Sequence, residues 1–319
     1  MILVTGATGF IGRNLVKRLM EQGEPVRCLI SQYRANHISW DTEAPNAPEV
    51  IIGSLLDDEV LFRAMAGVHT VIHLENAQWW GRFRDLERIE LNGTRKLIAA
   101  ARAARIGRII IPSHLGASSA SAYTLLKIKG QVEELIRASG LAYTIIRSGI
   151  VFGPEDHFIN HIAMMLSVNP LFFVMPGHGE IALHPIYIDD LVEAIVRSLE
   201  HIDIVDETIE IGGPEYTTFQ DMMYTIMRVT GMQRLLIPMP PYLVRTIVSI
   251  YSRIFPRSIM TPQWLDILAA NRTTRINNIY EIFGIQPRRF EDTLLTYLPK
   301  RRHFFSLLRM SLRRRPRGV

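Results

Sequence analysis

The feature that most limits how this chain can fold is a strand that runs directly into a turn with three glycines. The apolar run Ile2-Leu-Val-Thr5 leads into Gly6-Ala-Thr-Gly9-Phe-Ile-Gly12, and a helix with one apolar face follows. Gly6 permits a tight turn, Gly9 lets the backbone approach a ligand, and Gly12 lets the helix pack closely on the strand. Because amides and a partial positive charge gather at a helix start, the pattern predicts a bound diphosphate there.

After this turn, apolar runs rich in valine and isoleucine alternate with helical patterns for about 150 residues. This alternation is typical of parallel strands joined by crossover helices. We therefore predict an α/β fold, namely a Rossmann-type doubly wound parallel sheet with a smaller, mostly C-terminal substrate-side lobe. The predicted strands are Ile2 to Thr5, Val26 to Ile30, Val50 to Gly53, Thr70 to Leu74, Arg108 to Pro112 and Ala142 to Arg147. The predicted helices are Ile11 to Gln22, Asp57 to Ala66, Asp85 to Ala104 and Tyr123 to Ser139.

The regular pattern loosens after Gly153-Pro154 into turn-rich pieces separated by helices that contain many methionines. We predict that residues 1–155 form the NAD(P)-binding domain and that residues 181–213 return to its sheet. Residues 156–180 and 214–299 then form the substrate-side lobe, and residues 300–319 form a basic tail.

Cys28 is the single cysteine, which excludes an intramolecular disulfide and a cysteine-based zinc site and favours a reducing compartment. His157 and His161 have the spacing of a helical metal pair, but no glutamate lies between them in the metalloprotease pattern and no third ligand is evident, so we expect no metal. The first strand leaves no room for a signal peptide, and no apolar run reaches the ~20 residues that cross a bilayer. We expect a cytoplasmic protein that does not span a membrane.

The formal net charge of +5 is concentrated at the end of the chain. Residues 300–319 contain eight basic residues and no acidic one, so the remainder carries about −3 (5 − 8). Phenylalanine and leucine lie among these cations. This composition suits binding to the anionic inner face of a membrane or to an acidic protein partner. The alternative is a disordered, solubilising end. A basic run without base-reading geometry predicts no specific nucleic acid.

The choice of nicotinamide cofactor depends on the residues after the second strand, Ile30-Ser-Gln-Tyr-Arg34. An acidic residue there would bind the ribose 2′-hydroxyl, and none is present. Arg34, helped by Arg13, is instead suited to a 2′-phosphate, so NADP is preferred over NAD. The alternative is that Arg34 is a solvated loop charge. At the first turn itself, the predicted cofactor contacts are Gly6, Thr8, Gly9, Phe10, Ile11, Gly12 and Arg13.

Tyr123 and Lys127 lie four residues apart at the start of a predicted helix and would share one of its faces. A lysine ammonium beside a phenol favours the phenolate and lowers the pKa of tyrosine from ~10, which makes it a usable acid or base for a carbonyl or alcohol. The alternative is an ordinary pair on a helix surface.

Together these residues resemble the short-chain dehydrogenase/reductase superfamily, in its extended and atypical branches. Within it the chain is similar to the branch that contains the NADPH-carrying accessory subunit of respiratory complex I and uncharacterised bacterial epimerase/dehydratase-like proteins. That branch includes members with altered catalytic residues, so the resemblance alone does not fix an activity. The motifs that carry it are Thr5-Gly-Ala-Thr-Gly-Phe-Ile-Gly12, Val71-Ile-His-Leu74, Asn92-Gly-Thr94, Tyr123 with Lys127, Arg147-Ser-Gly-Ile-Val-Phe-Gly-Pro154 and His184-Pro-Ile-Tyr-Ile-Asp-Asp190.

The resemblance also implies roles for single residues. Lys127 would contact the nicotinamide ribose, and Asn92 would help maintain a water-linked proton path through the lysine, unless it only marks a helix kink. Ser54 stands where many relatives carry an aspartate that binds the adenine, and Leu55 beside it is a predicted cofactor contact.

A departure from the superfamily pattern occurs at the end of the fifth strand, where a serine or threonine is usual. Here the run is Ile111-Pro-Ser-His-Leu-Gly116, so Ser113 falls one place early and His114 takes the usual position. Either side chain is a candidate to complete the site, by a hydroxyl or by an imidazole that titrates near neutrality. The rival hydroxyl donors are Ser118, Ser119 and Ser121.

Two functions of different class follow. The first is an NAD(P)-dependent oxidoreductase or epimerase-type enzyme that acts on a small molecule, with hydride transfer at a carbonyl or alcohol carbon and Tyr123 as acid/base. The second is a non-catalytic NADP(H)-binding structural or assembly subunit of a membrane-associated complex, favoured by His114 and by the basic tail. A redox-sensing regulator is a third hypothesis, but no distinctive residue supports it.

Overall fold

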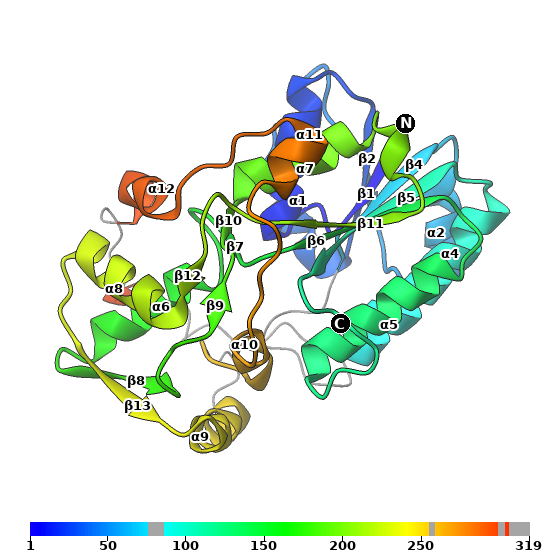
Figure 1. Cartoon of the computed structure of the whole chain (residues 1–319). Helices are drawn as coiled ribbons and strands as arrows, with labels where there is room; N and C mark the ends of the chain where they lie inside the picture. The colour runs from blue at the N-terminus through cyan, green and yellow to red at the C-terminus, as the bar shows by residue number, and fades with distance from the viewer. Residues whose placement is uncertain (76–85, 255–258, 299–303, 306–319) are drawn as a thin grey trace. The chain divides into compact units, whose positions relative to one another are not determined.

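The computed structural model describes residues 1–75, 86–254, 259–298 and 304–305 (Figure 1). The chain divides into two compact units. Unit 1 contains Met1–Ser148 and Ile188–Glu210; unit 2 contains Gly149–Tyr187 and the described residues from Ile211 onward. The segment that returns to unit 1 therefore begins at Ile188, later than the predicted start at residue 181.

Unit 1 is built on a seven-stranded sheet in the order β11-β6-β5-β4-β1-β2-β3. The pairs from β3 across to β6 are parallel, and the order reverses between β1 and β4. The fold is therefore the predicted Rossmann-like α/β fold, and its reversal point is where such sheets bind ligands. The strands are β1 (Ile2–Thr5), β2 (Val26–Ile30), β3 (Glu49–Ile52), β4 (Thr70–His73), β5 (Arg108–His114), β6 (Tyr143–Ser148) and β11 (Glu207–Ile211).

Helices cover both faces of this sheet (Figure 1). Helices α1 (Phe10–Glu21) and α7 (Ile188–Ser198) pack against each other. On the other face lie α2 (Asp58–Met65), α4 (Gly93–Ala103) and α5 (Thr124–Arg137). Because side chains alternate along a strand, one set of residues points into the core beneath these three helices. That set includes Leu3, Leu29, Val71, Ile109, Ile111 and Ile145.

The limits of the elements of unit 1 agree with the predictions to within two residues, and two details are notable. Strand β5 runs on through His114 instead of ending at Pro112, because Ser113 and His114 still pair with β6. The predicted helix 85–104 begins as a π-helix, η2 (Glu87–Asn92), before α4. Such π-turns often occur at functional sites. The 3₁₀ turns η1 (Gln32–His37) and η3 (Ile202–Ile204) complete this unit.

Unit 2 consists of short paired strands and helices. The strand pairs are β7 (Val151–Phe152) with β10 (Ile186–Tyr187), β8 (Phe172–Pro176) with β13 (Leu235–Met239), and β9 (Ala182–Leu183) with β12 (Thr217–Thr218). The helices are α6 (Ile159–Val168), α8 (Phe219–Thr230), α9 (Pro241–Ile254), α10 (Pro262–Ile267), α11 (Asn278–Phe283) and α12 (Phe290–Tyr297). Phe158 stacks on Trp264, and Phe152 meets Phe290 edge-on.

The predicted tail, residues 300–319, lies outside the described residues except for Phe304 and Phe305, which are helical and exposed. Among the described parts of the chain, no helix has the length and apolar character needed to cross a membrane.

Candidate dinucleotide site and buried charge network

The glycine turn between β1 and α1 has the geometry of a phosphate cradle. Gly6 adopts a φ of +68°, and a Cβ on Gly12 would lie 2.2 Å from the Gly6 carbonyl oxygen, so neither position accepts a side chain. Gly9 is the N-cap of α1 and carries no capping side chain, and the first turn holds no acidic residue. No residue of the first turn of α1 therefore sets a carboxylate against the positive end of the helix dipole, and the residues fit a diphosphate.

The carboxyl ends of β1 and β4 meet beside this turn, since Thr5 pairs with His73. Glu75 follows β4 and donates its backbone N–H to Thr5 Oγ1 at 3.2 Å. Burial raises the pKa of the Glu75 carboxyl to about 7, against the opposing effects of the Arg34 charge and a hydrogen bond from the Gly6 amide. A carboxyl group that is half ionised near neutral pH thus stands at the glycine turn.

Sequence reasoning missed Glu75. The available signal was an acidic residue just beyond a strand whose four residues are all buried, at the edge where a parallel sheet binds ligands. Arg34, which the sequence assigns to a 2′-phosphate, lies in η1 directly after β2, with its guanidinium over the ring of Tyr33. The Arg34 charge acts to lower the pKa of Glu75, so the two groups lie within electrostatic reach of each other.

A chain of buried polar groups extends from the turn into the interior of unit 1. Thr5 Oγ1 lies 2.7 Å from His73 Nδ1, and His73 Nε2 lies 3.2 Å from Thr94 Oγ1. Thr94 donates to the carbonyl of Glu90, whose carboxylate Oε2 accepts from Lys129 Nζ at 2.7 Å. Burial and the Lys129 charge lower the pKa of His73 to about 3, so this imidazole is neutral at physiological pH.

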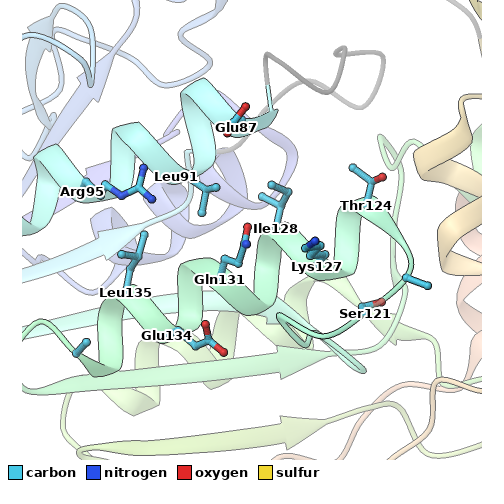
Figure 2. Close-up of a pocket in the computed structure, with 12 residues that line it drawn as sticks. Glu87, Leu91, Arg95, Ser121, Thr124, Lys127, Ile128, Gln131, Glu134 and Leu135 are labelled. Atoms are coloured by element: carbon cyan, nitrogen blue, oxygen red, sulfur yellow. The ribbon is translucent and has the colours of Figure 1, made fainter.

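Helix α5 carries two lysines on different faces. Residues two apart on an α-helix differ by about 200° in direction, so Lys127 and Lys129 point to opposite sides. Lys129 is buried against Glu90. Lys127 is exposed and lines a groove of about 730 Å³ between η2, α4 and α5 (Figure 2). Glu87, Leu91, Arg95, Gln131 and Glu134 also line this groove.

The buried lysine has no tyrosine one turn before it. The residue four before Lys129 is Leu125, which packs against Leu86 and Ile89. Tyr123 is the N-cap residue of α5, and its carbonyl accepts from the Lys127 amide at 2.9 Å. The first turn of α5 thus joins the backbones of Tyr123 and Lys127, while the Lys127 side chain lies in the groove.

Comparison with known proteins now fixes the family. Residues 2–212 match the model of the NAD dependent epimerase/dehydratase family, which is about two thirds of the chain. The chain belongs to this family. Its cofactor class is therefore a nicotinamide dinucleotide, in agreement with the glycine turn.

Similar proteins of this family include a respiratory subunit, an assembly factor and a sugar-nucleotide enzyme. The chain is 30% identical to the rat NADH dehydrogenase [ubiquinone] 1 alpha subcomplex subunit 9 over 272 residues, which cover 81% of the chain and 68% of the rat protein. It is 34% identical over 146 residues to the photosystem II assembly factor Ycf39 of Cyanophora paradoxa, covering 46% of the chain and 44% of that protein. The fold matches an NAD complex of Thermus thermophilus UDP-glucose 4-epimerase with a TM-score of 0.69 at 18% identity, over 95% and 98% of the two chains.

Of the other predicted site residues, Ser121 lines the groove with Lys127, whereas Ser113 lies in the interior beside α5. Ser113 is buried, and its hydroxyl donates to Glu133 Oε1 at 2.6 Å. Glu133 also accepts from Arg147 and Arg137. Burial acts to raise the pKa of Glu133, but the hydrogen bonds from Arg147, Ser113 and Arg137 outweigh it and hold the pKa below its usual range. Ser113 thus helps to fasten β5 to α5.

Asn92, the predicted member of a proton path, lies at the end of the π-turn η2. It is exposed, and its Oδ1 accepts from Arg95 at 2.7 Å. The π-turn that ends at Asn92 presents Glu90 to the interior instead.

The other candidate polar groups near α5 have local partners. His114 ends β5, and its carbonyl accepts from the Ala117 amide. Among the rival hydroxyls, Ser118 accepts from the Ala120 amide, Ser119 donates to Glu134, and Ser121 accepts from the Tyr123 amide.

The last predicted cofactor contacts differ in burial. Thr8 is buried, whereas Phe10, Ile11 and Arg13 are partly exposed at the start of α1. Ser54 is exposed, and its Oγ accepts from the Leu56 amide. Leu55 is buried so closely against α4 that a Cβ on Gly93 would lie 2.6 Å from its Cδ2.

In the ranges that the structure describes, no group of three or more histidine, cysteine or acidic side chains is arranged to hold a metal. The His157 and His161 rings lie 5.4 Å apart, and burial lowers the pKa of His161 well below its usual value. A neutral, buried imidazole of this kind is an ordinary part of a packed interior.

Proposed function

We propose that this protein holds NADP(H), or NAD(H), at its glycine turn as a retained group and acts as a nucleotide-binding accessory or assembly subunit of a protein complex. The observation that carries the proposal is the buried Lys129–Glu90 ion pair, which takes Lys129, the buried one of the two lysines of α5, out of acid/base chemistry. In this reading, the nicotinamide ring supplies a hydride donor or acceptor, and the protein does not couple it to a Tyr–Lys proton relay.

The chemistry of the pair supports this reading. A lysine activates a phenol only if its positive charge is uncompensated and close. Lys129 Nζ lies 2.7 Å from a carboxylate oxygen, and the residue one turn before it is an apolar leucine. Lys127 is exposed to solvent, where water and salt screen its charge. Neither lysine therefore has the surroundings that an activated tyrosine requires.

The relatives support a role in an assembly, because the rat protein is named as a subunit of NADH dehydrogenase and the Cyanophora protein as an assembly factor. For the cofactor, NADP is favoured by Arg34 in η1 and by the lack of an acidic residue in Ser31-Gln-Tyr-Arg34, directly after β2. We further propose that the basic residues 300–319 attach the protein to an acidic partner or to a membrane surface.

The test is to identify by mass spectrometry the nucleotide that co-purifies, and then to measure the affinity of the stripped protein for NADPH and NADH. We expect NADPH to bind more tightly and to raise the Tm, and Arg34→Ala to reduce this preference. Arg63→Ala, which removes an arginine at the end of α2, is the matched control. No measurable affinity for either nucleotide would sink the proposal.

A second candidate is the oxidoreductase or epimerase-type enzyme, which acts on a small molecule and uses Tyr123 with Lys127. It is favoured by one observation, that both residues lie in the first turn of α5. A panel of carbonyl and alcohol substrates, followed by NADPH absorbance, separates the two candidates. Hydride transfer that is lost in Tyr123→Phe but kept in the exposed control Tyr224→Phe would establish the enzyme. Absence of turnover in the wild type favours the accessory subunit.

A further inference from the structure

Helix α9 of unit 2 is apolar on the side that faces solvent. Leu243, Ile247, Ile250 and Ile254 are 41%, 56%, 54% and 67% exposed, and their spacing of four, three and four residues places them in one line. We call these four residues the α9 stripe. The opposite side of the helix is fixed to the protein by Val244 and Val248, each 4% exposed. A surface helix of a soluble domain normally turns polar residues outward, so the stripe needs a partner.

The residues that flank the stripe are those found where protein meets the headgroup region of a lipid bilayer. At 100° per residue, Tyr251 lies on one side of the stripe, and Tyr242 and Arg253 lie on the other. Both tyrosines are exposed, and so is Arg253. Tyrosine is enriched at membrane interfaces because its ring is apolar and its hydroxyl is polar, and arginine extends its charge toward phosphates.

The charge of this part of the chain is of one sign. Residues 222–265 contain five arginines and no lysine, aspartate or glutamate. Arg228 and Arg245 pair with Glu291 and Asp266 from outside this segment. Within the ranges that the structure describes, no carboxylate pairs with Arg253. The exposed Arg253, on the same helix as the stripe, therefore complements an anionic partner.

Two further exposed apolar residues lie on the strand pair β8 and β13, which comes before α9 in the chain. Helix α9 contacts β8, and α9 follows directly after β13 in the chain (Figure 1). On these two strands Phe172 and Leu235 are paired neighbours, and they are 39% and 67% exposed. Unit 2 therefore exposes apolar side chains on this strand pair as well as on α9.

We propose that α9 is an interfacial helix that lies in the surface of an anionic lipid bilayer. The stripe enters the boundary of the acyl chains, and Tyr242, Tyr251 and Arg253 stay at the level of the headgroups. At about 1.5 Å per residue the 14 residues of α9 extend about 21 Å, too short to cross a bilayer, so the helix lies flat.

The composition of the stripe favours lipid over a protein partner. Protein interfaces concentrate their binding energy in central aromatic and arginine residues that fill shaped pockets. Here the centre is aliphatic and the aromatic residues stand at its edges, an arrangement that needs neither shape complementarity nor directional hydrogen bonds. This inference does not depend on nucleotide binding.

The experiment uses the full chain with a fluorescent probe at the stripe. Cys28 is buried, and burial raises the pKa of its thiol to about 12, so it does not compete for thiol labelling. Ile250→Cys is labelled with an environment-sensitive dye, and Phe62→Cys on α2, where Phe62 is 78% exposed, is the matched control. Vesicles contain phosphatidylcholine alone or equal parts of phosphatidylcholine and phosphatidylglycerol. With the anionic vesicles, the dye at position 250 is expected to shift to shorter wavelength, and the dye at position 62 is expected not to change.

A second measurement removes the stripe itself. The variant Leu243→Ser, Ile247→Ser, Ile254→Ser is expected to partition onto the anionic vesicles at least about tenfold more weakly than the wild type. The control, Phe62→Ser with Ile202→Ser, removes exposed apolar residues of unit 1 and is expected to partition like the wild type. Circular dichroism confirms that both variants fold.

Three outcomes would overturn the proposal. One is an absence of binding to the anionic vesicles, and another is binding during which the dye at position 250 does not respond, which would place the attachment elsewhere, such as in residues 300–319. The third is that the stripe substitutions abolish self-association or binding to another protein while vesicle binding stays unchanged, which would make the stripe a protein contact.

Discussion

The two faces of helix α5 give their charged side chains very different surroundings. The inner face buries Lys129 and Glu133, each held by groups of opposite charge from neighbouring elements. The outer face carries Lys127, Gln131 and Glu134 along an open groove (Figure 2). Similar residue types thus stand in very different surroundings. The inner charges are needed for the stability of the fold. Substitution of the outer ones should change the free energy of unfolding little.

The largest effect should come from breaking the inner ion pair. Lys129→Met removes the cation that pairs with the buried Glu90 carboxylate, which typically costs about 3–5 kcal/mol in the free energy of unfolding. Lys127→Met on the outer face should change it by less than about 0.5 kcal/mol. Urea denaturation of both variants measures the difference, and equal stabilities would contradict the division between the faces. Adding Glu90→Leu to Lys129→Met should recover part of the loss, because no lone charge then remains buried.

The next largest effect is a pH dependence of the free energy of unfolding, which arises from the buried His73. Its folded pKa is about 3, against 6.5 for an ordinary imidazole, so the unfolded chain binds one more proton between these pH values. The folded state therefore loses stability as pH falls below 6.5, by about 1.4 kcal/mol per unit from this group. His73→Asn cannot titrate, and its stability relative to the wild type should rise by that amount per unit between pH 6.5 and 4.5. A constant difference would show that His73 is not held neutral.

The comparison of wild type and variant is needed because other groups act in the opposite direction. Burial raises the pKa of Asp156 to about 6 and that of Glu75 to about 7. Each of these carboxyls binds a proton more tightly in the folded state, so its contribution to stability is present at low pH and is lost as pH rises through the folded pKa. These contributions are common to both proteins and cancel in the difference.

A smaller change in stability is expected for two serines that donate hydrogen bonds to glutamates of α5, one on each face of the helix. Ser113→Ala removes one donor from the buried Glu133 carboxylate and should cost about 1.5 kcal/mol, since a hydrogen bond to a charged group is lost in the interior. Ser119→Ala removes the bond to Glu134 on the groove side and should cost less than about 0.5 kcal/mol. Thermal unfolding measures both. If Ser113→Ala instead leaves stability unchanged and abolishes a substrate-dependent turnover, Ser113 is catalytic and the structural assignment is wrong.

Local sequence patterns were sufficient for the fold of unit 1, because apolar runs, glycines and caps each act over a few residues. Strands β1 and β2 have the predicted limits, and α1 starts one residue before the predicted position. The order of the strands in the sheet could also be predicted from the sequence, because alternating strands and helices permit few parallel topologies.

The orientation of side chains around α5 and η2 did not follow from spacing alone. The interval between Tyr123 and Lys127 is right for a pair, but tertiary packing decides which side of a helix faces the core. Gly130 was the unused signal: a Cβ there would lie 2.2 Å from the Ser118 backbone, so the face of Lys129, Gly130 and Glu133 must be the inner one. In the same way, the π-turn at Glu87–Asn92 changes which residue points inward, and sequence periodicity assumes a regular helix.

The smallest predicted effect is a pH dependence of nucleotide affinity that arises from Glu75. Glu75 lies at the Gly6 amide and within electrostatic reach of Arg34, the proposed partner of a 2′-phosphate. Above pH 7 the ionised Glu75 competes for Arg34 and repels phosphate, while below pH 7 the neutral acid does neither. A nearby like charge is worth about 1 kcal/mol, so the Kd of NADPH should rise about fivefold between pH 6 and pH 8.

Because NADPH itself titrates in this range, Glu75→Gln is measured at the same pH values, and NADH serves as the ligand without a 2′-phosphate. The variant should show a smaller change with pH than the wild type, and NADH a smaller change than NADPH. Identical pH profiles for wild type and Glu75→Gln would mean that the carboxyl beside Gly6 does not sense the ligand. The polar chain from Thr5 to Lys129 would then stabilise the fold without contributing to nucleotide binding.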